Sequence, residues 1–193
     1  MNLGNLDFNI GGINPSGIGV TVYRVAKKDI TSWPTVNDDP NGSGSGSGDS
    51  LSKMVGDFTL ASGKKWDKIY STQGKGKATF ETIGETDCMM VNNKLTLSFP
   101  DLTAEALGFS KAAMNGDFVY VVKSAGRYHV IGSKDYRTVT QPAGDTGDAA
   151  GSAKGCTIEI TAPDVTPLPI YQGVIVTADG SLDCGTDTFT PAA

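Results

Sequence analysis

The stretch Lys94–Phe99 (KLTLSF) decides the fold class of this chain. Its apolar and polar side chains alternate strictly, with Leu95, Leu97 and Phe99 set against Lys94, Thr96 and Ser98. Successive side chains of a β-strand point to opposite faces, so a period of two predicts a strand with one face in a core and the other in water. The clearest pattern in the sequence is therefore that of a half-buried sheet.

Strand-like segments continue on both sides of this stretch. Each is short and rich in β-branched or aromatic residues. Their expected ranges are 20–25, 54–60, 66–70, 78–83, 118–123, 127–131, 157–161 and 170–177. Ser124–Gly126 joins two of them in a short hairpin, and Asp179-Gly180 turns the chain into residues 181–184 in a second hairpin.

One helix is predicted directly after KLTLSF. Apolar residues at i, i+4, i+7 and i+11 form a single stripe: Leu102, Ala106, Phe109 and Ala113. Asp101 or Thr103 can cap the first turn, and Asn115-Gly116 ends the helix. We expect the stripe to pack on the sheet, so that Phe109→Ala costs about 3–5 kcal/mol.

These elements predict a mostly β protein, with a β-sandwich or barrel-like core, one flanking α-helix and two long loops. Residues 1–193 are expected to form a single domain. An extended arm is expected over 1–17, a Gly/Ser-rich loop over 34–53 and a Gly/Asp-rich loop over 141–155. The run NGSGSGSGDS at 41–50 cannot build a core, so we expect contacts from a neighbouring subunit to order it.

Composition limits the possible partners. The chain has 25 glycines in 193 residues, a formal net charge of −5 and a pI of about 4.8. A nucleic-acid binder normally presents a basic surface that replaces counterions of the phosphates. For the basic clusters Lys64-Lys65 and Lys75/Lys77 a solvated surface is the simpler interpretation. No basic leader precedes an apolar stretch at the N-terminus, and no segment has the length of a membrane span, so synthesis in a cytoplasm is expected.

The cysteines do not form a recognisable motif. Cys88, Cys156 and Cys184 are odd in number and far apart, and there is no CxxC pair. Neither a zinc site nor a redox motif is supported by such spacing. We therefore expect three buried free thiols.

No catalytic, cofactor-binding or metal-ligating residues are predicted, and the chain is not expected to be an enzyme. The single histidine, His129, lies within a predicted strand without a neighbouring carboxylate. Asp145 and Asp148 lie in a turn-rich segment that lacks the spacing of a calcium loop. Glu81 and Glu85 could form a carboxylate pair, but scattered surface acids are far commoner.

The second half of the chain resembles tail tube proteins of bacteriophages that infect Bacteroidetes. The resemblance covers residues 93–178. It rests on the order of a helix (LTAEALGFSKAAMNGD), a hairpin (FVYVVKSAGRYHVIG), a Gly/Asp-rich segment, KGCTIEITAPDVTPLPIYQG and a last strand. No chemically distinctive residue contributes to it.

The resemblance implies a virion structural protein that forms stacked, hexameric rings. The rings would enclose a channel through which DNA passes without specific binding, and other tail proteins would join the tube. Synthesis in the host cytoplasm and a final place in the phage tail follow from it. Because like charges repel, we expect a net negative channel wall that includes Glu81 and Glu159.

Two other classes remain open at this point. One is another phage structural part, such as a capsid decoration protein or a tail terminator. The other is a carbohydrate-binding β-sandwich, for which the chain offers only two tryptophans, Trp33 and Trp66.

Overall fold

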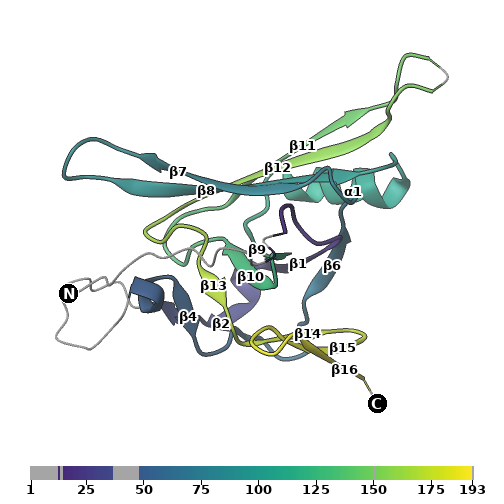
Figure 1. The fold of residues 1–193 in the computed structure, drawn as a ribbon. Helices are drawn as coiled ribbons and strands as arrows, with labels where there is room; N and C mark the ends of the chain where they lie inside the picture. Colours follow the sequence, from purple (N-terminus) through teal and green to yellow (C-terminus); the bar gives the residue numbers. More distant parts are fainter. Residues whose placement is uncertain (1–12, 14, 37–47, 150, 193) are drawn as a thin grey trace.

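Two β-sheets face each other in a computed structural model, which describes residues 13, 15–36, 48–149 and 151–192 of the chain (Figure 1). The first sheet has four antiparallel strands in the order β11-β12-β8-β7. Their bounds are β7 Lys77–Ile83, β8 Met90–Phe99, β11 Val139–Asp145 and β12 Gly155–Asp164.

The second sheet has seven strands in the order β3-β4-β13-β10-β9-β1-β6. Their bounds are β1 Thr21–Ala26, β3 Thr35–Val36, β4 Lys53–Val55, β6 Asp67–Tyr70, β9 Phe118–Ser124, β10 Arg127–Ile131 and β13 Ile170–Tyr171. Two small sheets, β2-β5 and β14-β15-β16, complete the β structure. Their strands are β2 Ile30–Ser32, β5 Thr59–Leu60, β14 Val174–Thr177, β15 Gly180–Asp183 and β16 Thr188–Pro191, and the 3-10 turns are η1 Lys27–Asp29 and η2 Gly48–Leu51.

The stretch KLTLSF lies in the middle of the four-stranded sheet and confirms the predicted period. Leu95 and Leu97 of β8 are buried and lie opposite Ile160 and Ile158 of β12. These side chains form a core with Val22 and residues of β9 and β10 from the seven-stranded sheet. The predicted β-sandwich with one helix is therefore present.

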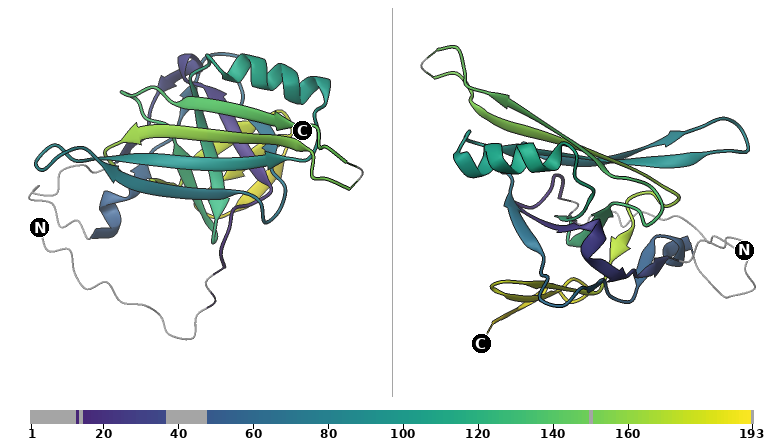
Figure 2. Two further views of the ribbon diagram at one scale, coloured as in Figure 1. Left: turned by 90° about the horizontal axis from the view of Figure 1, so that it is seen from above. Right: turned by 180° about the vertical axis from the view of Figure 1, so that it is seen from behind.

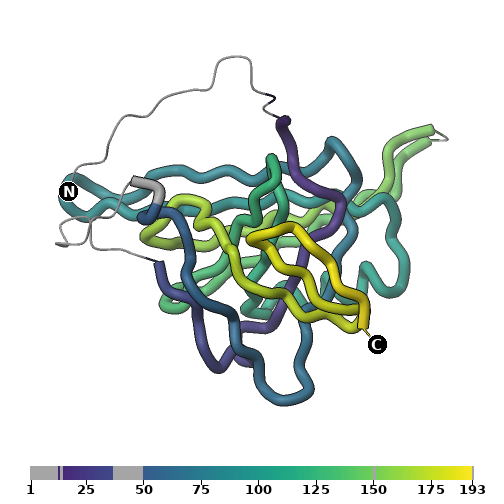
Figure 3. Tube along the Cα trace, turned by 60° about the horizontal axis from the view of Figure 1, so that its bottom comes forward, coloured from purple at the N-terminus to yellow at the C-terminus, as the bar shows by residue number. Residues whose placement is uncertain are grey.

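Strand β9 has a core on each of its faces. Tyr120 and Val122 point toward the four-stranded sheet, whereas Val119 and Val121 point the other way. A second core, rich in aromatic residues, forms on that other side. The C-terminal strands lie on this side of the molecule (Figure 3). The central ring of this core is Phe58, which lies 5.1–5.5 Å from the rings of Trp33, Trp66 and Tyr171. The molecule thus has three layers, with the seven-stranded sheet in the middle.

Both predicted hairpins are confirmed. In the first, Ala125 and Gly126 connect β9 to β10 with φ angles of 49° and 77°. Positive φ at both central residues matches the twist of a two-residue hairpin, and glycine adopts it without strain. In the second, Asp179 connects β14 to β15, and Gly180 begins the return strand.

The predicted helix is α1 Ala104–Ala113, which runs along the β11 edge of the four-stranded sheet (Figure 2). Of the two cap candidates, Thr103 is the cap, because its hydroxyl accepts a hydrogen bond from the Ala106 N–H. Asp101 instead accepts a hydrogen bond from the Leu102 N–H and pairs with Lys154. The stripe of Leu102, Ala106, Phe109 and Ala113 is turned inward, as predicted.

The predicted loop over 141–155 is partly wrong. Gln141–Asp145 belongs to β11 and pairs with β12 back to Gly155, so only the tip of this hairpin is irregular. Pro142 stands within β11, where sequence rules argue against a strand. It is tolerated because β11 is an edge strand, and proline can direct its missing N–H away from the neighbouring strand.

Other boundaries also differ from the sequence-based expectation. The strands expected over 54–60 and 170–177 are each divided in two, at 56–58 and at 172–173. In the first, Gly56 has a φ of +94°, which ends the extended conformation. In the 34–53 region the structure places β3, η2 and the start of β4, while 37–47 lies outside the described residues. The expected N-terminal arm also lies outside them, except for residues 13 and 15–17.

Candidate functional site

No other described segment covers one face of the four-stranded sheet, and we call it the outer face (Figure 1). The strand register places its side chains in rows across the sheet. One row is Gln141, Glu159, Thr96 and Lys77; the next is Val139, Thr161, Lys94 and Thr79; a third is Ala143, Thr157 and Ser98. Most of these side chains are short and carry a hydroxyl or amide group, so the outer face is flat and polar.

The charges at the centre of the outer face balance. Its central part carries two lysines, Lys77 and Lys94, and two glutamates, Glu81 and Glu159. Glu81 and Lys94 form an ion pair with an N–O distance of 2.6 Å, and this hydrogen bond lowers the pKa of Glu81. Glu81 and Glu159 thus share one face of the sheet. At the centre of this face the two lysines offset the two glutamates.

Two hairpins extend the four-stranded sheet beyond the body of the molecule (Figures 1 and 2). The β7–β8 hairpin points to one side, and the β11–β12 hairpin points toward the side of α1. The tip of the first hairpin consists of Gly84–Met89, six consecutive exposed residues, and is called the hairpin tip below. It includes the exposed thiol of Cys88 and the side chain of Met89, which is 63% exposed.

The hairpin tip has a specified backbone. The Cys88 N–H donates to the Glu85 carbonyl at 3.0 Å. Gly84 has a φ of +98°, and a Cβ atom there would stand 2.3 Å from the Cys88 carbonyl oxygen. Asp87 has a φ of 69°, a left-handed conformation that aspartate adopts more readily than most residues. The hairpin tip is therefore an ordered projection, closed by a turn that requires glycine.

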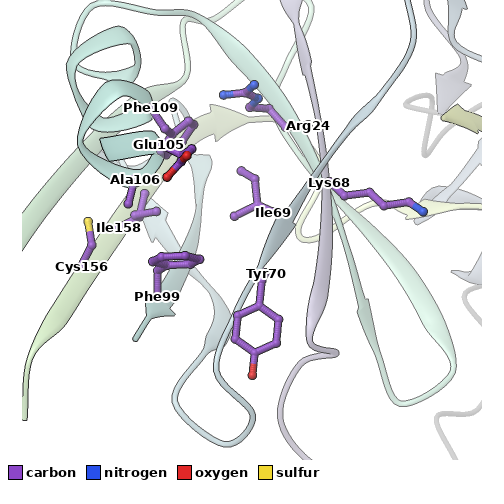
Figure 4. Close-up of a pocket in the computed structure, with 10 residues that line it drawn as sticks. All are labelled: Arg24, Lys68, Ile69, Tyr70, Phe99, Glu105, Ala106, Phe109, Cys156 and Ile158. Carbon is purple, nitrogen blue, oxygen red and sulfur yellow. The ribbon is translucent and has the colours of Figure 1, made fainter. Parts of the chain in front are cut away.

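A pocket of about 220 Å³ opens between α1 and the ends of β6 and β8, and we call it the helix pocket (Figure 4). Its lining is mainly apolar. Ile69 and Ile158 come from the two facing sheets, and the aromatic rings belong to Tyr70, Phe99 and Phe109. Tyr70 is half exposed and contacts Phe99 edge-on, with 6.4 Å between the ring centroids. The pocket is thus a gap at the open side of the sandwich, surrounded by aromatic rings.

Arg24 forms one wall of the helix pocket (Figure 4). Its guanidinium carbon lies 4.9 Å and 5.0 Å from the ring centroids of Phe109 and Phe118. One terminal nitrogen binds the Asp67 carboxylate at 2.6 Å. Its Nε is buried and has no hydrogen-bond partner among the described residues. A buried donor without a partner is costly.

A second, more polar cleft of about 470 Å³ lies beside Trp33. Asp135 and Asp164 line it together with Thr166. Burial raises the pKa of the Asp164 carboxyl, and the neighbouring Asp135 charge adds to this shift. Trp66, the other tryptophan, is 2% exposed and belongs to the aromatic core, so only Trp33 could stack on a sugar ring.

The titratable residues singled out in the sequence occupy separate places. His129 Nδ1 lies 2.9 Å from the Leu168 carbonyl oxygen. Asp145 accepts a hydrogen bond from the Gly147 N–H, and Asp148 accepts one from the Ser152 hydroxyl, so each shapes the tip of the β11–β12 hairpin. Glu85 lies at the hairpin tip, away from Glu81. Within the described ranges no three His, Cys, Asp or Glu side chains gather as metal ligands would.

The cysteine expectation is partly wrong. Cys156 and Cys184 are buried free thiols, as expected, but Cys88 is exposed. Sequence reasoning missed the hairpin tip and the helix pocket. The sequence GETDCMM at 84–90 did hold a signal for the former, since a glycine and two acids interrupt an apolar strand pattern.

In the part of the chain that the structure describes, no helix has the length and hydrophobicity needed to cross a membrane. Comparison of the chain with protein-family models, with curated proteins and with solved structures found no match.

Proposed function

We propose that this chain is a structural subunit of a phage tail tube, built from stacked rings whose outer faces line a channel for DNA. The observation that carries the proposal is the outer face itself. A sandwich that worked alone would have no need for a large, flat, uncovered sheet with two hairpins that overhang the body. In a ring, the same sheet forms the wall and the hairpins reach neighbouring subunits.

The chemistry of the outer face suits passage of DNA. Binding of DNA depends mainly on the release of counterions when lysines and arginines neutralise phosphates. At the centre of the outer face two lysines are offset by two glutamates, so this region provides no net attraction for the phosphates of DNA. Neutral hydroxyl and amide groups interact with water and phosphate with similar strength, so DNA would slide past them.

The resemblance of residues 93–178 supports the same proposal. Hexameric symmetry, the presence of other tail proteins and a place in the virion come from that resemblance. A non-enzymatic role is part of the same proposal. His129, Asp145 and Asp148 each have a hydrogen-bond partner within the chain.

Electron microscopy of the purified full-length protein tests the proposal. Negatively stained samples at increasing concentration are expected to show rings of uniform diameter and tubes built from them. The outcome that would overturn it is a protein that stays a 20.1 kDa monomer at high concentration in every buffer tried. Closed particles instead of tubes would favour a capsid decoration protein. Single rings that never stack would favour a tail terminator.

The cleft beside Trp33 favours the carbohydrate-binding alternative, because it combines one aromatic ring with hydroxyl and carboxyl groups. Glycan-array binding by a monomer that is lost in Trp33→Ala would support that alternative. A protein that forms tubes and binds no glycan would refute the carbohydrate-binding alternative.

A further inference from the structure

We propose that the hairpin tip of one copy docks in the helix pocket of a second copy, with Met89 inserted between the aromatic rings. This inference deepens the proposed function and rests on it in one respect, the requirement for self-assembly. The partner is a second copy of this chain, and the contact joins two different surfaces.

The two surfaces lie at opposite ends of the same strands. Strand β8 begins directly after the hairpin tip and ends at Phe99, which lines the helix pocket. With ten residues at roughly 3.3 Å each, the two sites are about 30 Å apart. A copy therefore cannot fill its own pocket. A contact between two different surfaces adds copies head to tail, and it closes into a ring when the rotation between copies allows.

The helix pocket fits the side chain of Met89. Its volume of about 220 Å³ exceeds the roughly 150 Å³ cavity that holds benzene in a well-studied engineered protein. Phe99, Phe109 and Tyr70 surround it, and a thioether makes favourable contacts with aromatic rings. Met89 is 63% exposed in one copy, at the end of a backbone that the turn at Gly84 holds in place. An apolar side chain on an ordered projection loses little entropy when it is buried.

Charge complementarity supports the same pairing. Glu85 and Asp87 at the hairpin tip are exposed, and no ion pair is present for either of them among the described residues. At the opposite end of the β7–β8 hairpin, Lys75 and Lys77 are also exposed and outside every ion pair of the described part. Lys75 lies in a turn whose Thr72 N–H donates to the Ser98 carbonyl, next to Phe99 of the helix pocket. The hairpin tip is therefore acidic. The end beside the helix pocket carries the exposed Lys75 as well as one acid of the lining, Glu105, and the lysine favours head-to-tail contact.

Arg24 supplies a specific donor for the incoming segment. Its guanidinium lies beside Phe109 in the pocket wall, and its side chain is 19% exposed (Figure 4). Carbonyl and carboxylate groups of the hairpin tip are hydrogen-bond acceptors that could satisfy this donor. The docked state thus adds a hydrogen-bond partner for the partly exposed guanidinium.

Disulfide trapping in the full-length protein tests the contact directly. Cys88 stands beside Met89 and is the one exposed thiol among the described residues. Gln73→Cys places a second thiol in the exposed turn that follows Tyr70 of the helix pocket, and Ser62→Cys places a matched thiol in an exposed turn elsewhere. Mild oxidation of Gln73→Cys is expected to give a ladder of covalent oligomers, each link joining Cys88 of one copy to the introduced thiol of the next. Cys88→Ser should abolish the ladder. Equal ladders from Ser62→Cys, or none from Gln73→Cys, would overturn the contact.

A pair of methionine substitutions and a charge exchange provide a second test. Met89→Ser is expected to weaken self-association at least tenfold in analytical ultracentrifugation. Met114→Ser, at a methionine 57% exposed at the end of α1, should leave association unchanged. Glu85→Lys should weaken association, and the added Lys75→Glu should restore it. Equal effects of the two methionine changes, with no rescue by the charge exchange, would refute the docking.

The results separate this contact from the proposed function. Tubes of normal stability from Met89→Ser would refute the contact and leave the tail tube standing. Filaments that never form rings would overturn the proposed tail tube. If such filaments contain disulfides between Cys88 and the thiol introduced by Gln73→Cys, the contact itself would be supported.

Discussion

At the residue scale, Tyr120 shows how a polar group is held between the two sheets. Its side chain is fully buried, and its hydroxyl lies 2.9 Å from the Thr140 hydroxyl of β11. Burial raises the pKa of Tyr120 to about 12, because the charged phenolate would lose its hydration. The neutral phenol is thus favoured in the folded state relative to the unfolded chain.

The first prediction concerns the pH dependence of this residue. A folded pKa above the unfolded value of about 10 means that the stabilising contribution is complete below pH 10 and is lost as the pH rises toward 12. Tyr120→Phe should lower the free energy of unfolding by about 1–2 kcal/mol at pH 7, since Thr140 loses its partner. The variant should also lose less stability between pH 10 and 12. Urea unfolding at pH 7 and pH 11 measures both effects, with Tyr136→Phe, at a 41% exposed tyrosine, as the control.

The second prediction separates the three thiols. Burial raises the pKa of Cys184 to about 12, and the carboxylates of Asp183 and Asp187 add to the shift. Cys156 is also buried, 3.6 Å from the Ser110 hydroxyl. A thiol reagent at pH 8 should therefore modify one cysteine of the native protein quickly. It should modify all three cysteines of the protein unfolded in urea. Rapid modification of native Cys88→Ser would contradict the assignment of burial.

At the element scale, α1 is anchored along one stripe only. Ala113 is fully buried, whereas Phe109 is partly buried and forms a wall of the helix pocket under the Arg24 guanidinium. Leu107, on the opposite side of the helix, is 53% exposed. The helix therefore depends on a few contacts and on its Thr103 cap.

The third prediction revises the expected cost of losing Phe109. Since Phe109 faces a pocket instead of a filled core, Phe109→Ala should cost about 1–3 kcal/mol, below the 3–5 kcal/mol typical of a buried phenylalanine. Thr103→Ala should cost about 1 kcal/mol through the lost cap. Thermal or urea unfolding measures both, and Leu107→Ala serves as the exposed control that should change little. A Phe109→Ala protein as stable as the wild type would show that the helix does not rest on this ring.

At the scale of the whole molecule, charge balance on the outer face is the property that the proposed channel requires. The molecule has a net charge of −5, yet the centre of this face carries equal numbers of lysines and glutamates. A channel lined by this face would neither repel DNA strongly nor hold it.

The fourth prediction tests this balance in assembled tubes. Glu159→Lys changes the outer face by two charge units per subunit, and Asp135→Lys makes the same change at an exposed site in the cleft beside Trp33. Tubes of Glu159→Lys should retain DNA at low salt and release it as salt increases. Tubes of Asp135→Lys should behave like the wild type in the same filter-binding assay. DNA retention by both variants alike would show that the outer face does not line the channel.

The sequence by itself determined the local elements whose patterns are complete within a few residues. The alternation of KLTLSF, the stripe that includes Phe109 and the turns at Ser124–Gly126 and Asp179-Gly180 predicted a strand, a helix and two hairpins, and all are present. These features depend on side-chain direction and on the backbone preferences of single residues, which are local properties.

Only the tertiary structure decided which strands are edges, where the sheets remain uncovered and which side chains meet. Gln141–Asp145 looked like a loop, because glycine, proline and aspartate are poor strand formers, but pairing with β12 overrode that preference. Gly84–Met89 became an exposed projection because β7 and β8 extend beyond the facing sheet. The helix pocket brings Arg24, Phe99 and Phe109 together from three elements. Such proximity arises from sheet order and packing, which no local sequence pattern encodes.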